Sequence, residues 1–416
     1  MKIHFLDRFN PKKPLCALAA LAAAFLPAAA EARVYTGLEV FMSKYVSIVA
    51  GKRVGLVTNP TGVNGNLTPT VDLFKGDKRI NLVALFSPEH GIRGDVRAGE
   101  NVAGGRDPKT GLPVYTLYGG KDHRPTKESL DKIDVLVFDI QDVGSRTYTY
   151  IWHMAECMSA CAIAGKPVIV LDRPNPLGAE VIDGPVTEKQ YLCFIGLYPV
   201  PRVYGMTIGE LARYLNAEEK IGCQLTVVPM INYRRGMSWE ETGLPWVPSS
   251  PHIPSSQSAC CFAATGTIGE LGTISIGIGY TLPFQTIGAP WLFGESDAAA
   301  LNALGLPGVR FRPIHYKPFY GAYKEQDING VQIHVTNPAT FKPTTTEVAI
   351  LCHLRKYYPK QFSISSDKAA AFDKAMGNSS VRSSIMKGAS YQQIAASWAA
   401  QDVAFKAKRD KYLIYK

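Results

Sequence analysis

The sequence of 416 residues lacks the short glycine motifs of the common nucleotide-binding folds. No Gly-x-Gly-x-x-Gly follows its first apolar strand pattern and no Gly-x-x-x-x-Gly-Lys-Ser/Thr occurs, so nothing indicates a dinucleotide or a nucleoside triphosphate. No Gly-x-Ser-x-Gly follows a predicted strand, which argues against the nucleophile of an α/β-hydrolase. We expect a protein that works without a cofactor.

Cysteine is scarce and follows no metal-binding pattern. Seven of the eight cysteines lie beyond residue 32, an odd number whose spacings match no zinc site. Cys157 and Cys161 stand four residues apart in an apolar helical stretch, which is typical of packing residues. In an oxidising compartment one or two disulfides can form, and the sequence does not define their pairing. Basic and aromatic residues do not cluster, so we expect no nucleic-acid partner.

Residues 1–32 have the pattern of a secretory signal peptide. Basic residues precede an Ala- and Leu-rich run at 15–26, and small residues follow at 28–30. The run is short for a membrane span, and no second run of membrane length follows it. We expect an exported protein, periplasmic or extracellular, without a transmembrane segment once the signal is removed. Losing four basic and two acidic residues then lowers the formal charge from +10 to about +8, which suits an anionic partner.

The chain that follows alternates apolar strand patterns with helix patterns. Continuous Val, Ile and Leu runs are typical of parallel strands that are buried on both faces. Thr68 is expected to cap the first helix, with Pro69 at its first position. The sequence therefore predicts an α/β fold with a Rossmann-like, doubly wound, mainly parallel sheet. Strands are expected at 53–57, 81–86, 113–118, 134–139, 167–171 and 225–229, and helices at 68–74, 148–164 and from 207.

A stretch rich in Pro, Ser and His at 246–258 marks a change in composition. We predict a Rossmann-like catalytic domain at 33–255 and a smaller C-terminal α+β domain at 256–416 that completes the cleft. In the second domain we expect short β-like runs at 266–290, a strand at 331–335 and helices at 367–375 and 390–406.

Polar side chains follow four of the expected strands where each strand ends. Because the carboxyl ends of parallel strands share one edge of a sheet, we expect these side chains to converge. Glu89 stands out, since Pro88 and Gly91 fix an irregular backbone in which glutamate has no capping advantage. For Asn59 and Asp172, taken singly, capping of a turn is the simpler interpretation. The residues of this edge are Asn59, Glu89, His90, Asp139, Gln141, Asp142, Arg146, Arg173 and Asn175.

Carboxylates surrounded by amides and hydroxyls suit the hydrolysis of a glycosidic bond. Glu89 is the expected general acid, which protonates the leaving oxygen. Asp139 or Asp142 is the expected second carboxylate, which activates water, acts as nucleophile or stabilises a cationic transition state. Arg146 and Arg173 are expected to bind a substrate carboxylate, since arginine does so in bidentate fashion.

Several sequence blocks make the chain similar to a family of exported bacterial proteins. They lie at 87–94, 138–146, 172–176, 205–210, 242–246, 288–291 and 412–415. On these blocks the chain resembles glycoside hydrolase family 171, formerly the domain of unknown function DUF1343, whose characterised members are exo-acting β-N-acetylmuramidases.

The resemblance implies release of terminal N-acetylmuramic acid from the non-reducing end of peptidoglycan-derived saccharides or muropeptides. It also implies an active site between the two predicted domains, with Glu89 as the catalytic residue. The lactyl carboxylate of N-acetylmuramic acid gives Arg146 or Arg173 a partner. The expected substrate-binding set is Asn59, His90, Arg93, Gln141, Arg146, Tyr148, Arg173, Asn175, His252 and Glu270.

Three segments depart from the pattern of that family. Gly-Ile-Gly-Tyr stands at 277–280 where Gly-Arg-Gly-Thr is usual, His252 stands in place of an asparagine, and Tyr204 stands where histidine is common. All three lie outside the blocks around Glu89 and Asp139. They therefore bear on the choice of sugar more than on the chemistry.

Other interpretations stay open at this point. One is a non-catalytic protein that binds muropeptides or wall glycan, one is an exo-hexosaminidase with an altered sugar preference, and one is a hydrolase of another bond such as an amide. A metal site built from His90, Asp139 and His153 is a weaker alternative, and we expect no metal. Retention or inversion depends on the separation of the carboxylates, and assistance by the 2-acetamido group of the substrate and the oligomeric state are equally open.

Overall fold

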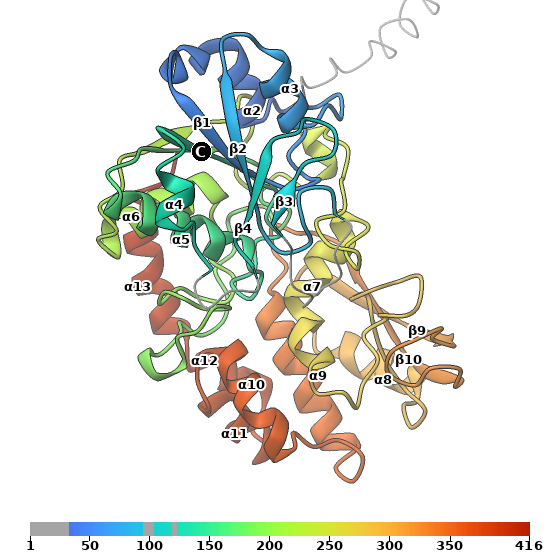
Figure 1. Cartoon of the computed structure of the whole chain (residues 1–416). Helices are drawn as coiled ribbons and strands as arrows, with labels where there is room; N and C mark the ends of the chain where they lie inside the picture. Colours follow the sequence, from blue (N-terminus) through green and yellow to red (C-terminus); the bar gives the residue numbers. More distant parts are fainter. Residues whose placement is uncertain (1–32, 95–103, 119–122) are drawn as a thin grey trace, which may run out of the picture. The chain divides into compact units, whose positions relative to one another are not determined.

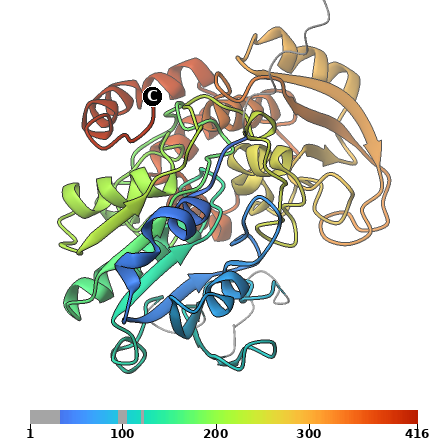
Figure 2. The ribbon, with the colours of Figure 1, turned by 90° about the horizontal axis from the view of Figure 1, so that it is seen from above.

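Seven strands form one sheet in the order β3-β4-β2-β1-β5-β6-β7. Figure 1 labels the first four of these strands along the chain, and Figure 2 shows the same ribbon from above. The computed structural model describes residues 33–94, 104–118 and 123–416, so the predicted signal peptide lies outside the described residues. All neighbouring strands are parallel except β3, which is antiparallel to β4. The expected mainly parallel sheet is therefore confirmed. The strands are β1 Arg53–Thr58, β2 Asn81–Ser87, β3 Gly105–Arg106, β4 Pro113–Thr116, β5 Val135–Asp139, β6 Val168–Leu171 and β7 Leu225–Val228.

Helices cover both faces of this sheet because its strands are apolar on both sides. In β5, Val135 and Val137 belong to one core cluster, together with Phe74 of α3. Leu136 and Phe138 belong to a second cluster, which contains the buried face of α5. This alternation confirms a doubly wound sheet. The helices of this region are α2 Gly37–Val40, α3 Thr70–Gly76, α4 Lys127–Leu130, α5 Tyr150–Ile163 and α6 Ile208–Glu218.

A second, antiparallel sheet of three strands follows in the order β8-β10-β9. Strands β9 and β10, orange in Figure 1, pair along eight residues each. The predicted C-terminal region with both strands and helices is thus confirmed. Its elements are α7 Ser256–Gly269, β8 Thr286–Ala289, α8 Gly294–Ala303, β9 Val309–Tyr316, β10 Ile328–Val335, α9 Pro343–Tyr357, α10 Ser366–Met376, α11 Ser380–Met386, α12 Tyr391–Ala396 and α13 Ala399–Arg409.

Three of the expected elements were wrong in detail. Helix α3 begins after Pro69 and has no side-chain cap, so Thr68 does not cap it. The helix expected at 390–406 is divided into α12 and α13, and the buried Trp398 lies at the turn between them. The segment 266–290 begins inside α7, a helix of small residues with no polar face, and contains only the short strand β8.

Two buried arginines in the loops after β5 and β6 contact the C-terminal helices. Arg146 donates through Nη2 to the carbonyl of Ala375 in α10 at 2.7 Å. Arg202 forms an ion pair with Glu347 of α9 at 3.0 Å, and both side chains are almost fully excluded from solvent. A buried guanidinium is tolerated only where a counter-charge, as for Arg202, or several hydrogen-bond acceptors, as for Arg146, compensate for the lost water. These contacts therefore fix α9 and α10 against the loops that follow the larger sheet.

The seven described cysteines are all free thiols, so the disulfides considered from the sequence are not formed among them. In the described part of the chain, no helix combines the length and the apolar character that a membrane crossing requires.

Candidate active site

A pocket of about 700 Å³ lies beside the end of strand β2, and we call it the Glu89 pocket. Glu89 and His90 line it directly after β2, and the turn 147–149 lines it directly before α5. Further walls come from α7, from the segment 274–284 and from α10. A pocket of this size can enclose a small saccharide.

Two hydroxyl groups hold the carboxylate of Glu89. The Thr149 hydroxyl donates a hydrogen bond to Glu89 Oε2 at 2.9 Å. Tyr118, which follows β4, also bonds the carboxylate, and burial followed by the charge of Glu89 raises the pKa of Tyr118 to about 12. Tyr118 therefore stays protonated at neutral pH and remains a donor. The half-buried carboxylate is fixed in position at the wall of the pocket.

The backbone around Glu89 is irregular, as the sequence predicted. His90 adopts a left-handed conformation with φ of +73°, and only 5% of it is exposed. A side chain other than glycine rarely adopts this conformation, which costs on the order of 1 kcal/mol. Gly91 follows with φ of +81° and donates its N–H to the carbonyl of Pro88 at 3.2 Å. This tight turn ends β2 and sets Glu89 and His90 side by side in the pocket wall.

Three more of the predicted residues line the Glu89 pocket. His252 lies near His90, and burial followed by that neighbouring imidazole lowers the pKa of His252. Tyr148 is buried and donates to the Ser249 hydroxyl at 3.0 Å. Glu270 is exposed at the end of α7. Of the described residues that line the pocket, Glu89 and Glu270 are the two carboxylates.

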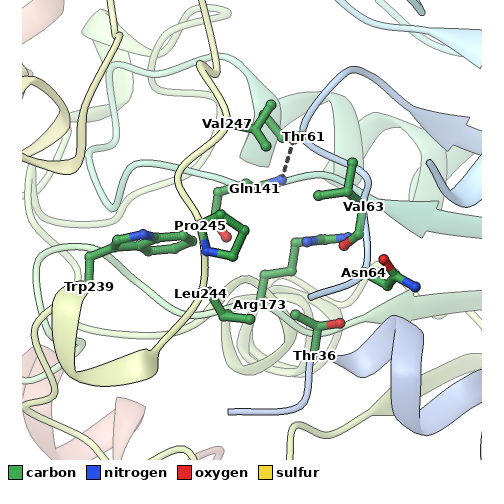
Figure 3. Close-up of a pocket in the computed structure, with 10 residues that line it drawn as sticks. All are labelled: Thr36, Thr61, Val63, Asn64, Gln141, Arg173, Trp239, Leu244, Pro245 and Val247. Carbon is green, nitrogen blue, oxygen red and sulfur yellow. Dashed lines mark hydrogen bonds between the residues drawn. The ribbon is translucent and has the colours of Figure 1, made fainter. Parts of the chain in front are cut away.

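The carboxyl edge of the sheet next to β5 and β6 is filled by the protein itself. Asp139 is fully buried and accepts two hydrogen bonds from Arg173, at 2.6 and 2.8 Å, and a third from the Thr70 hydroxyl. The pocket beside Arg173, which Gln141 also lines, holds about 20 Å³ (Figure 3). That volume is enough for about one water molecule and far too small for a sugar. Asp139 and Arg173 therefore do not reach a substrate in this structure.

Asp142, the other predicted second carboxylate, also lies away from the Glu89 pocket. It is 5% exposed, and it accepts hydrogen bonds from the Tyr204 hydroxyl and from the N–H of Gly144. Burial raises the pKa of Asp142 to about 6. The group is thus held by the backbone and by Tyr204 rather than presented to the pocket.

The remaining predicted residues make internal contacts. The Arg146 guanidinium is buried and donates to three backbone carbonyls. Arg93 pairs with Asp107 at 2.9 Å outside the pocket. The amides of three residues bond to neighbouring groups within the loops after the strands, namely Asn59, Gln141 and Asn175. The capping interpretation of Asn59 agrees with its contact to the Thr61 N–H at 2.9 Å.

The Glu89 pocket therefore contains Glu89, His90, Tyr148, His252 and Glu270 from the predicted set, and their roles in catalysis stay predictions. Sequence reasoning missed Tyr118, Thr149, Phe194 and Lys374. Thr147 and Thr149, the two hydroxyl residues on either side of Tyr148 in the segment between β5 and α5, were a signal for Thr149. No sequence pattern indicated Lys374, because nothing in the sequence predicts that α10 lies beside the end of β2.

The alternative metal set is not assembled. Burial lowers the pKa of His153 to about 3, and its ring lies 6.1 Å from that of His123 and 5.1 Å from that of Phe194. Asp139 is occupied by Arg173. Within residues 33–94, 104–118 and 123–416, no three His, Cys, Asp or Glu residues are grouped so that they could hold a metal ion.

Comparison with known proteins places these features in a family. Two family models match the chain. The model of the N-terminal part of the exo-β-N-acetylmuramidase NamZ matches residues 54–257, and the model of its C-terminal part matches residues 260–415. The chain is 44% identical over 383 residues to the peptidoglycan β-N-acetylmuramidase NamZ of Bacillus subtilis, which covers 92% of each chain.

Solved structures agree with this sequence similarity. A DUF1343 family protein from Bacteroides fragilis matches with a TM-score of 0.87 and 42% identity, over 92% of this chain and 99% of that one. A second DUF1343 family protein from the same organism matches with a TM-score of 0.73 and 30% identity over the same shares. The chain thus belongs to the exo-β-N-acetylmuramidase NamZ family.

Proposed function

We propose that this protein is an exo-acting glycosidase that releases terminal N-acetylmuramic acid from the non-reducing end of peptidoglycan fragments. Membership of the NamZ family supports the bond and the sugar. One structural observation carries the site: Glu89 lines a pocket of about 700 Å³ and is held there by Thr149 and Tyr118. The pocket at the carboxyl edge next to β5 and β6, in contrast, has no room for a sugar.

Glu89 acts as the general acid in this proposal. Its proton passes to the glycosidic oxygen as the bond from the sugar C1 breaks. Water then supplies the hydroxyl that C1 finally carries, and the remaining proton of that water restores the acid form of Glu89. Thr149 and Tyr118 bond the carboxylate and keep it aimed at the pocket. Preorganised donors of this kind cost no rearrangement during the reaction.

Glu270 is the protein group that can serve as the second carboxylate. It is the other carboxylate among the described residues of the pocket, whereas Asp139 and Asp142 are buried elsewhere. The 2-acetamido group of the substrate is the competing choice, because it can attack C1 without a second carboxylate. The effect of Glu270→Gln on the rate separates these two routes.

The proposed substrate agrees with export of the protein, which we infer from the leader-like residues 1–32. N-terminal sequencing of the protein recovered outside the cytoplasm tests this. A mature chain that begins near residue 31 or 33 supports export, and an intact Met1 in the cytoplasmic fraction argues against it.

The activity is tested with two glycosides of N-acetylmuramic acid, one with a nitrophenol leaving group and one with N-acetylglucosamine. We expect Glu89→Gln to lower kcat on the disaccharide by about 10² to 10⁴, the usual contribution of a general acid. The loss on the nitrophenyl glycoside is expected to be smaller, because nitrophenolate leaves with little help from a proton. Glu128→Gln, on the exposed side of α4, is the matched control and is expected to leave both rates unchanged.

Equal, measurable rates for wild type and Glu89→Gln on both substrates would contradict the role of Glu89. No release by the wild type from either substrate, combined with measurable binding of the sugars, would instead favour the non-catalytic binding protein.

A further inference from the structure

Helix α10 supplies a cation to the Glu89 pocket. Ala371, Lys374 and Ala375 all line the pocket, and their spacing places them on one face of the helix. The two alanines leave room beside the longer side chain. Of the described residues that line this pocket, Lys374 is the one lysine or arginine.

No acidic side chain in the described part of the chain forms an ion pair with Lys374. The adjacent Asp373 is bound by Arg382, with contacts of 2.8 Å to each carboxylate oxygen. Among the described residues, no carboxylate lies within 4 Å of the Lys374 ammonium group. The positive charge is therefore available to a ligand.

Hydrogen bonds to the end of α10 fix the backbone next to Lys374. Arg146 donates to the carbonyl of Ala375, the next residue, and the Glu188 N–H donates to the carbonyl of Gly377 at 2.9 Å. Arg146 is itself fixed by the carbonyls of Pro185 and Val200. Arg146 was expected to bind a substrate carboxylate, and the structure shows it fastening the last turn of α10 instead. These hydrogen bonds therefore fix the position of the Lys374 backbone at the pocket.

Much of the remaining wall is apolar, with Phe262, Ile274, Ile276, Ile278 and Phe284 facing the pocket. A carboxylate is stable beside such a wall only when a cation or several donors pair with it. N-acetylmuramic acid differs from N-acetylglucosamine by a lactyl ether that carries one carboxylate.

We propose that Lys374 binds the lactyl carboxylate and selects N-acetylmuramic acid over N-acetylglucosamine. This inference rests on the proposed function, because it names the group that recognises that substrate in the same pocket. Lys374 is a binding residue here and takes no part in proton transfer.

The test compares nitrophenyl glycosides of the two sugars on wild type, Lys374→Met and Lys374→Arg. We expect Lys374→Met to raise KM for the muramic acid glycoside by about 10- to 100-fold, the usual worth of a charge-assisted hydrogen bond. KM for the glucosamine glycoside and kcat for both are expected to stay within about twofold, because neither depends on the lactyl group. Lys374→Arg keeps the charge and is expected to recover most of the affinity. Lys368→Met, on the same helix but outside the pocket lining, is the control.

Binding of the free sugars to Glu89→Gln, measured by titration calorimetry, gives a second readout that needs no turnover. The inference predicts that Lys374→Met in this background weakens N-acetylmuramic acid and leaves N-acetylglucosamine unaffected. Equal effects on both sugars, or none on either, overturn it. A wild type that cleaves neither glycoside refutes the proposed function, and the calorimetric comparison then still decides the role of Lys374.

Discussion

The buried pair of Asp139 and Arg173 makes the clearest prediction about this protein. The two side chains are 0% and 4% exposed and share two hydrogen bonds, of 2.6 and 2.8 Å. Asp139→Asn removes the negative charge and leaves the guanidinium buried without a counter-charge. Loss of one partner of a buried pair costs about 3–5 kcal/mol, and we expect the free energy of unfolding to fall by that amount.

Unfolding in urea, followed by circular dichroism at neutral pH, measures this loss. The double variant Asp139→Leu, Arg173→Met removes both charges, and we expect it to be more stable than Asp139→Asn. Asp131→Asn is the control: its pair with Lys127 is exposed on α4, and its removal is expected to cost less than about 1 kcal/mol.

Two results would refute this reasoning. If Asp139→Asn unfolds like the wild type but no longer cleaves substrate, Asp139 is a catalytic group, as the sequence suggested. If the double variant is no more stable than the single one, the buried pair does not account for the loss.

Three further predictions concern the interior. Burial raises the pKa of Asp172 to about 7, so the folded state binds this proton more tightly than the unfolded state. The free energy of unfolding should therefore fall by up to about 4 kcal/mol between pH 4 and pH 7. Urea titrations should show a flatter dependence of the free energy of unfolding on pH for Asp172→Asn than for the wild type. Tyr204→Phe removes a hydroxyl donor from buried Asp142, which should lower the free energy of unfolding by about 1–3 kcal/mol, and unchanged urea midpoints would contradict this. Gly279→Ala places a methyl group against a backbone carbonyl at φ of +85°, whereas at Gly305 φ is +65° and the space is open. Gly279→Ala should therefore lower the free energy of unfolding by about 1–3 kcal/mol more than Gly305→Ala. Thermal unfolding of the two variants measures this difference.

The larger sheet could be predicted because its strands are buried on both faces. Runs such as 135–138 are continuously apolar, are followed by polar residues and lie between helix patterns. The structure confirms them as parallel strands. Helix α7 could not be predicted in the same way, since its small residues are buried on most sides of the helix. It therefore has no polar stripe that would show the helical period of 3.6 residues in the sequence.

The candidate site was only partly predictable for a different reason. The rule that strand ends converge placed Glu89 correctly at the carboxyl edge, but it gave equal weight to Asp139, Asp142 and Arg173. Whether a polar side chain faces a cavity or a partner depends on loops that sequence patterns do not position. The Thr70 hydroxyl, which fills part of this edge by bonding Asp139, lies 69 positions away in sequence.

The buried contacts of Arg146 and Arg202 also limit how this chain can be recombined. Each arginine lies in the stretch matched by the N-terminal family model, and each partner, Ala375 or Glu347, lies in the stretch matched by the C-terminal one. A chimera that joins residues 33–257 to the second half of a relative must therefore receive a carboxylate that meets Arg202. A fragment that ends near residue 257 would leave two guanidinium groups without these acceptors. The two halves are expected to be inherited, expressed and engineered as one piece.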